Sequence, residues 1–404
     1  MNPTGKAARE VIRFLDELRK IGKLTDGVQL ENGGRLQVSI LDRTQQLPPG
    51  LDGNVKDNHI LQVALRLKET KKSVLLVTKD ADLRIKADVL GQQSADYVPG
   101  YENLEGGIYT GAREIQTDNA RIDHFYKARK MDLAEFLKAH PQTVDPSENE
   151  YLSIKGPSKS ALARISLDRG EVDLLHLPDE KIFGILPRNR EQRFAFHALL
   201  DPSVQIITLS GRAGTGKTLM AIACGLEQVT HEMRYRKMLI ARPTVPMGRD
   251  LGFLPGELGE KLDPWMQPVY DNLELLLGDS QKGESDREKR HTTGADYLMN
   301  SGLLSVEPLS YIRGRSIPRQ FIIIDETQNL SPHETKTIIT RVGEGTKIVF
   351  TGDYYQIDHP YLNFYTNGLT FLIERFRNQK LAAHINLLKG ERSELAELAS
   401  QLLE

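Results

Sequence analysis

The chain has 404 residues, which is too long for one ordinary domain and predicts two or three. Its formal net charge of −2 argues against a protein that coats nucleic acid or membrane by bulk charge, although a local basic groove stays compatible with it. The single cysteine, Cys224, excludes an internal disulfide and fits a reducing compartment. The apolar runs are far shorter than a membrane span, so we expect a cytoplasmic protein without a membrane partner.

The first region alternates between helical and strand patterns. Residues 1–26 have an apolar stripe at helical spacing, and residues 35–41 alternate like a strand. An amphipathic helix at 58–70 then precedes a short buried strand at 73–78 and a further helix. This succession predicts a small parallel α/β layer over residues 1–120, which includes a loop at 97–111.

Two further regions follow. Residues 121–185 contain two strand-like runs separated by "DRG", which predicts a connector with a β-hairpin. From 186 onward a basic helical start leads into an apolar strand at 204–209 and then into a glycine-rich stretch and a helix. We therefore expect a third domain over 186–404. Cys224 lies in that helix and is interpreted as a small buried hydrophobic residue.

The glycine-rich stretch has the spacing G-x-x-x-x-G-K-T between a strand and a helix. Glycines let the backbone curl until several N–H groups face phosphate oxygens, and the helix adds its positive end. Lysine reaches the β- and γ-phosphates, and the threonine hydroxyl binds Mg²⁺. The predicted nucleotide-binding residues are Gly211, Arg212, Ala213, Gly214, Thr215, Gly216, Lys217 and Thr218.

A second motif, "FIIIDETQN", supplies the acids that hydrolysis requires. Asp325 follows four apolar residues and stands at the carboxyl end of a predicted parallel strand, where ligands bind. We interpret Asp325, with Thr218, as the Mg²⁺-side group, and Glu326 as the residue that polarises the attacking water.

Two glutamines are further candidates. Gln356 follows the next strand in "TGDYYQID" and is expected to sense the γ-phosphate, whereas a plain turn is the alternative. Gln192 lies about twenty residues before the loop. An amide can read both the donor and the acceptor on an adenine edge, so Gln192 is expected to contact the base.

"GRAGTGKT", "DETQN" and "GDYYQ" together resemble the motifs of superfamily-one helicases, and residues 186–404 resemble the PhoH-like ATPase family more closely. The resemblance implies an α/β fold with a single RecA-like P-loop core, in which a mostly parallel sheet lies between helices. It implies ATP and Mg²⁺ as cofactors, and ring-like homo-oligomers, with a hexamer among them.

The first region resembles the later part of a PIN nuclease domain, through "GKAAREVIRFLDELRK", "KDNHILQVAL" and "LLVTKDADLRIKADVLG". Asp57 and Asp80 match two of the carboxylates that hold Mg²⁺ or Mn²⁺ in such domains, and Asp82 is an accessory. The opening strand and helix that carry the other acids have no match here. The resemblance therefore implies a partial PIN domain with weak or no ribonuclease activity, unless Asp42, Asp52 or another subunit completes the site.

Arginines near the third domain's motifs suggest an RNA partner, single-stranded or structured. Arg313, Arg315 and Arg319 precede the Asp325 strand, and Arg242 and Arg249 follow another strand. Such residues hold phosphates by bidentate hydrogen bonds, although a solvated basic edge is the alternative.

Arg313 and Arg315 are also the first candidates for a residue that completes the ATP site of a neighbouring subunit, with Arg392 as an alternative sensor. Trp265 could stack on a base, but packing is the more common role of a lone tryptophan.

The leading interpretation is thus a Mg²⁺-dependent ATPase that binds, unwinds or remodels RNA and carries a PIN module. A small-molecule kinase and an ATP-gated oligomeric scaffold are the alternatives. A kinase shares the phosphate-binding loop but does not require the "DETQN" and "GDYYQ" pair.

Overall fold

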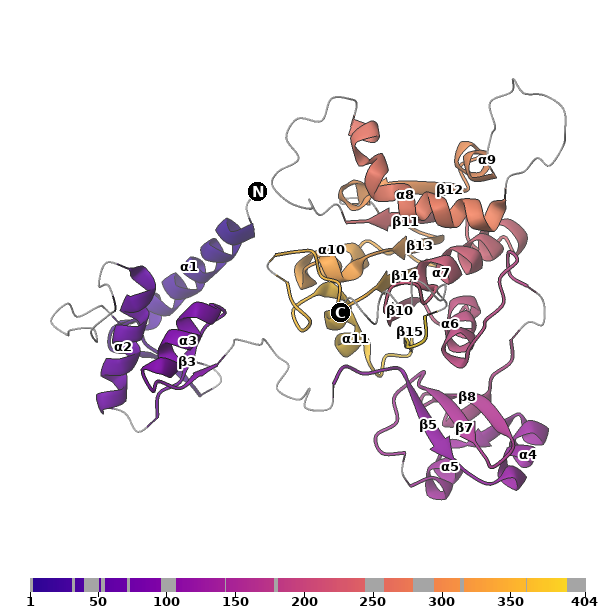
Figure 1. Cartoon of the computed structure of the whole chain (residues 1–404), viewed down its shortest axis with the longest axis horizontal. Coiled ribbons are helices and arrows are strands. Elements are labelled where there is room, and N and C mark those ends of the chain that lie inside the picture. Colours follow the sequence, from indigo (N-terminus) through magenta and orange to yellow (C-terminus); the bar gives the residue numbers. More distant parts are fainter. Residues whose placement is uncertain are drawn as a thin grey trace. The chain divides into compact units, whose positions relative to one another are not determined.

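A computed structural model of the chain describes residues 3–30, 33–39, 51, 55–70, 73–95, 107–141, 143–177, 181–243, 258–278, 294–312, 316–360 and 362–390 (Figure 1). The chain divides into two compact units, Met1–Val98 and Pro99–Glu404.

The first unit is a small α/β structure. Among its described residues, a buried apolar cluster joins α2 (Lys56–Thr70), β3 (Leu76–Val77) and α3 (Ala81–Val89) through Leu61, Leu76, Leu83 and Ala87. Two short strand pairs are present, β1 with β2 antiparallel and β3 with β4 parallel. The strand expected at 35–41 thus pairs with β1 and not with the strand expected at 73–78, and only β3 and β4 form a parallel pair. The elements are α1 (Pro3–Ile21), β1 (Val28–Gln29), β2 (Arg35–Leu36), α2 (Lys56–Thr70), β3 (Leu76–Val77), α3 (Ala81–Val89) and β4 (Ser94–Ala95).

The second unit begins with a five-stranded mixed sheet in the order β5-β7-β8-β9-β6. The hairpin expected around "DRG" is formed by β8 and β9, which are antiparallel. Its turn ends at Gly170, whose φ of 65° favours glycine. The elements are β5 (Ala112–Gln116), α4 (Asn119–Ala128), β6 (Lys130–Asp132), α5 (Leu133–Ala139), β7 (Tyr151–Lys155), β8 (Ser160–Ser166) and β9 (Glu171–Leu174).

The division between the first region and the connector differs from the expected one. We placed residues up to 120 in the first domain, but β5 at Ala112–Gln116 pairs in parallel with β7 and belongs to the five-stranded sheet. The sequence did not reveal that β5 belongs to this sheet, because two helices and a strand separate β5 from its partner β7 along the chain.

The rest of the second unit is a six-stranded parallel sheet in the order β12-β11-β13-β14-β10-β15. Its strands are β10 (Ile206–Gly211), β11 (Lys237–Arg242), β12 (Leu304–Pro308), β13 (Gln320–Ile324), β14 (Lys347–Gly352) and β15 (Ala382–Leu387). Its α-helices are α6 (Arg190–Leu200), α7 (Lys217–Leu226), α8 (Leu258–Leu277), α9 (Gly294–Asn300), α10 (Pro332–Ile339) and α11 (Gly368–Phe376), with a π-helical turn at Glu227–His231 and 3₁₀ turns at Leu309–Ile312 and Thr327–Asn329.

Both faces of this sheet are buried, because successive strand residues point to opposite faces. In β13, Phe321 and Ile323 pack in the cluster that includes residues of α6, α7 and α8. Their neighbours Ile322 and Ile324 pack in the cluster of α10 and α11. The architecture is the expected α/β P-loop core, a parallel sheet between helices (Figure 1).

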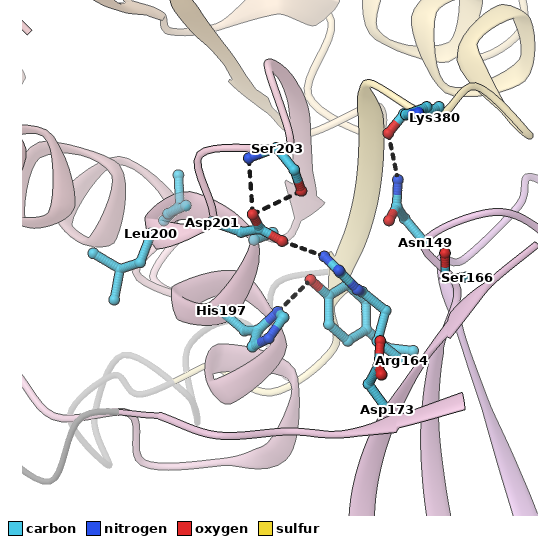
Figure 2. A network of polar contacts seen from close by, with 12 residues as sticks. Asn149, Arg164, Ser166, Asp173, His197, Leu200, Asp201, Ser203 and Lys380 are labelled. Atoms are coloured by element: carbon cyan, nitrogen blue, oxygen red, sulfur yellow. Dashed lines mark hydrogen bonds and ion pairs between the residues drawn. The ribbon is translucent and has the colours of Figure 1, made fainter. Parts of the chain in front are cut away.

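The five-stranded sheet is held against the core by a network of polar side chains (Figure 2). Arg164 of β8 pairs with Asp201 at the end of α6, and Asn149 donates to the carbonyls of Lys380 and Ala382 beside β15. Burial alone would raise the pKa of Asp201, but hydrogen bonds from Ser203 and the charge of Arg164 lower it to about 2. This carboxylate therefore remains charged and bound to Arg164 across the neutral range.

Among the described residues, no helix combines the length and the apolar character needed to cross a membrane. Cys224 is free and fully buried in α7, as expected, and burial raises the pKa of its thiol.

Candidate nucleotide site

The loop between β10 and α7 has a tightly curled backbone. Gly211, Gly214 and Gly216 have φ values of 147°, 80° and 87°, in the region that only glycine adopts readily. A side chain at Gly211 would also collide with the next strand, since its Cβ would lie 2.4 Å from the Leu387 carbonyl oxygen. The curl leads directly into the first turn of α7, whose N–H groups suit an anion.

Lys217 is the first residue of α7 and closes this loop. Its ammonium donates to the carbonyl of Gly211 at 2.6 Å and to that of Arg212 at 2.9 Å. The hydroxyl of Thr215 also donates to the Arg212 carbonyl. The ammonium of Lys217 is thus held within the curl, where the phosphates of a nucleotide are expected.

Asp325 stands where the sequence placed it, just beyond the end of β13 and next to α7. One of its oxygens, Oδ1, accepts hydrogen bonds from Thr218 at 2.9 Å and from Thr351 at 2.5 Å. Its backbone N–H donates to the Ala241 carbonyl, which fixes it against β11. Hydroxyl and carboxylate oxygens are the ligands that Mg²⁺ prefers, so Thr218 and Asp325 fit a magnesium ion.

Glu326 adopts a left-handed backbone conformation, with φ 53° and ψ 41°. Its carboxylate accepts from Arg242 at 3.2 Å and from Gln328 at 2.5 Å. Burial raises the pKa of Glu326 above its usual range, the adjacent charge of Asp325 adds to this, and Arg242 opposes it. A carboxylate with a raised pKa is a suitable general base.

Gln328 is a site residue that the sequence analysis missed. Its amide donates to Glu326 and to the Gln356 carbonyl at 2.9 Å, and its oxygen accepts from the Asp353 N–H at 3.1 Å. It therefore joins the end of β13 to the loop after β14. A Cβ at Gly352 would lie 2.3 Å from the Gln328 oxygen, which explains a glycine there.

The two glutamines predicted from the sequence make contacts with the protein around the site. The backbone carbonyl of Gln356, rather than its side chain, contacts Gln328. Gln192 is buried on α6, accepts from the Arg188 N–H at 2.7 Å and donates to the Thr215 carbonyl at 3.2 Å. Gln192 thus supports the phosphate-binding loop, and its contact with adenine stays a prediction, as does the γ-phosphate role of Gln356.

Of the arginines predicted to act in the site or to bind RNA, one lies in the candidate nucleotide site and several lie outside the described residues. Arg242, which we considered for RNA phosphates, pairs with Glu326 inside the nucleotide site. Arg313, Arg315, Arg249 and Arg392 lie outside the described residues, as do Asp42 and Asp52. Trp265 is half-buried on α8 beside the buried Met266.

In the first unit, the three predicted acids lie near one lysine. Asp82 pairs with Lys86 at 2.6 Å, and Asp82, Asp57 and Asp80 all contribute to raising the pKa of that lysine. Asp80 caps α3, because its Oδ1 accepts from the N–H groups of Asp82 and Leu83. Within the described part of the chain, no three acidic, histidine or cysteine side chains are arranged to hold a metal.

Comparison with known proteins accounts for both units. The model of the PhoH family, described as PhoH-like protein, matches residues 184–404, which is more than half of the chain. The chain belongs to the PhoH-like protein family. A model of the PIN domain matches residues 2–98, which confirms the PIN-like region ahead of the PhoH-like domain.

Relatives match along the whole chain. The protein PhoH2 of Bacillus subtilis is 42% identical over 100% of this chain and 90% of its own length. A PhoH2 of Thermobispora bispora is 34% identical over 99% of this chain and 86% of its own. Among solved structures, a Sulfolobus solfataricus SWI2/SNF2 ATPase core in complex with dsDNA aligns with 52% of this chain and 47% of its own. That alignment has a TM-score of 0.30 and 14% identity, which is too weak to support a conclusion.

Proposed function

We propose that this PhoH-like protein hydrolyses ATP in a Mg²⁺-dependent reaction and couples hydrolysis to binding, unwinding or remodelling of RNA. The observation that carries the ATPase proposal is the hydrogen bond of 2.9 Å between Thr218 and Asp325, which brings the loop threonine and the acid of β13 together beside Lys217 and Glu326. These are the groups that phosphoryl transfer to water requires.

Each residue has a distinct task in this proposal. The N–H groups of the loop bind phosphate oxygens, and Lys217 exchanges its carbonyl partners for the β- and γ-phosphates. Thr218 and Asp325 would hold Mg²⁺, which neutralises phosphate charge when bound. Glu326 accepts a proton from the attacking water, while Arg242 and Gln328 orient its carboxylate.

Completion of the site by a second subunit is part of the proposal. Negative charge that develops on the γ-phosphate is stabilised by a guanidinium, and P-loop enzymes often receive one from a neighbour. Arg313 and Arg315, with Arg392 as the alternative, are the candidates in a homo-oligomer such as a hexameric ring. ATPase activity per chain should therefore fall on dilution to the monomer.

The PIN-like unit supports a link to RNA, because PIN nucleases cleave phosphodiesters. We propose that its own ribonuclease activity is weak, since Asp57, Asp80 and Asp82 share their surroundings with Lys86 rather than forming a metal cluster. Mg²⁺ or Mn²⁺ would be the metal there. We also propose a cytoplasmic location.

Steady-state ATPase activity, measured with and without single-stranded RNA and together with the native mass, tests this proposal. Multiple turnover that RNA stimulates supports coupling. Turnover that RNA leaves unchanged favours the ATP-gated scaffold, and phosphate transfer to a small acceptor instead of water favours the kinase.

A further inference from the structure

The connector domain contains a cavity that the nucleotide site does not account for. Its volume is about 310 Å³, and it lies among α4, α5 and β7. This volume is at the lower end of the range for small-molecule sites, which suits one ring system rather than a long chain. All of its lining residues come from the connector between Thr117 and Ile154, and none comes from the phosphate-binding loop.

The cavity walls are mainly apolar and aromatic. Ile122, Phe125 and Phe136 line it and are buried. The ring of Phe136 lies against that of His140, with centroids 4.6 Å apart and planes inclined by 47°. Aromatic faces of this kind favour a flat, polarisable ligand over a flexible aliphatic one.

Polar groups are placed at several points on the same walls. Thr117 lines the cavity, and its Oγ1 is buried without a hydrogen-bond partner in the described structure. The buried ring of His140 is kept neutral, because burial lowers its pKa, so it has one donor and one acceptor nitrogen. The exposed Glu135 adds an acceptor at the rim.

We propose that this cavity binds a nucleobase, supplied either by a free nucleoside or nucleotide or by an RNA strand; the RNA source rests on the proposed RNA function. A base has flat faces for Phe136 and His140 and an edge with both donors and acceptors for Thr117, His140 and Glu135. A simple anion would leave the apolar walls unused. An acyl chain would leave the buried Thr117 hydroxyl without a partner.

The proposal predicts binding without phosphates or ATP. The full chain carrying Lys217→Ala, which removes the charge that the nucleotide site offers to phosphates, is titrated with adenosine, guanosine, cytidine and uridine, and saturation-transfer NMR and calorimetry report binding. At least one nucleoside should bind. Thr117→Val, which removes the hydroxyl at nearly constant shape, should weaken that binding about tenfold, the effect of one lost hydrogen bond.

Thr143→Val is the matched control. Like that of Thr117, the Oγ1 of Thr143 is buried and has no hydrogen-bond partner in the described structure, but Thr143 does not line the cavity. This variant should leave nucleoside affinity unchanged. Ala139→Phe, which fills the cavity, should abolish binding, and circular dichroism shows whether it folds.

A single-stranded oligoribonucleotide then separates the two sources. If Thr117→Val weakens both nucleoside and oligonucleotide binding, the base comes from RNA; if it weakens only nucleoside binding, a free nucleoside or nucleotide is the ligand. Absence of binding by all four nucleosides overturns the proposal, and so does equal weakening by Thr143→Val. RNA-stimulated ATPase activity that persists in that case would leave the proposed function standing.

Discussion

At the scale of single residues, Glu326 is placed by its backbone as much as by its side chain. A left-handed conformation costs a residue other than glycine about 1–2 kcal/mol. Here it turns the chain sharply after β13, so that Asp325 faces Thr218 while Glu326 faces Arg242 and Gln328. Two adjacent acids thereby acquire different partners and different roles.

Glu326→Gln should keep ATP binding and lose turnover by about 10²-fold or more, because the amide preserves shape but cannot accept the proton. Stopped-flow binding of a fluorescent ATP analogue, measured beside steady-state hydrolysis, separates the two effects. The raised pKa of Glu326 also predicts that the wild-type rate falls with decreasing pH earlier than an ordinary glutamate would allow. Unchanged turnover in the variant would reject Glu326 as the base.

Most of the candidate nucleotide site could be predicted because its residues lie in two short motifs, at 211–218 and 321–329. Lys217, Thr218 and Asp325 needed only a spacing and the end of an apolar strand. Gln328, Thr351 and Arg242 could not be assigned to the site, because their role depends on β14 and β11 being the neighbours of β13. That strand order is set by tertiary packing and leaves no local signal.

At the scale of elements, helix α6 links the five-stranded sheet to the phosphate-binding loop. Gln192 near its start contacts Thr215, and Asp201 after its end pairs with Arg164. The last carbonyls of the helix are bound by a buried lysine, Lys347 at the start of β14, which donates to Leu199 and Asp201 at 2.7 Å each and to Ala198 at 3.3 Å.

Lys347→Met should destabilise the second unit by about 1–3 kcal/mol, because it removes a buried donor from three carbonyls, of which Leu199 and Asp201 keep a second donor from Gln228 and Val204. Urea unfolding followed by tryptophan fluorescence and circular dichroism measures the change. Lys336→Met, at an exposed position of α10, is the control and should have little effect. Equal midpoints for the two variants would show that the Lys347 contacts contribute nothing net.

Some strands were predicted from the sequence, and others were not. The strand expected at 204–209 is β10 at Ile206–Gly211, and the run at 321–324 lies within β13. The hairpin at "DRG" was also identified. The sequence did not indicate β6 or the pairing of β5, because strands of three to five residues that pair over long distances have no distinctive pattern.

At the scale of the whole molecule, acid should destabilise the second unit through buried histidines. Burial lowers the pKa of His384 to about 3 and that of His197 to about 4, against 6.5 for an ordinary histidine. Between pH 6.5 and these values the unfolded chain binds the extra protons, so stability falls as pH falls. At pH 5 the loss is about 2 kcal/mol for each histidine.

His384→Gln, which cannot titrate, should therefore lose about 2 kcal/mol less between pH 7.5 and pH 5 than the wild type. Denaturant unfolding at the two pH values measures this difference. An identical loss in both proteins would show that His384 is not responsible.

The PIN-like unit should cleave single-stranded RNA weakly or not at all in Mg²⁺ or Mn²⁺. Among the described residues no three acidic, histidine or cysteine side chains are arranged to hold a metal, and Asp80 already caps α3. A comparison of the full chain with Asp80→Asn decides this. Robust cleavage that disappears in the variant would contradict the prediction.

The central claim is that the loop around Lys217 binds and hydrolyses ATP. Its most direct test is the release of phosphate from Mg²⁺-ATP by the full chain, compared with Lys217→Ala and with Lys336→Ala as an exposed control. The account predicts multiple turnover in the wild type and the control, and loss of both binding and turnover in Lys217→Ala. Hydrolysis by Lys217→Ala at the wild-type rate would contradict it.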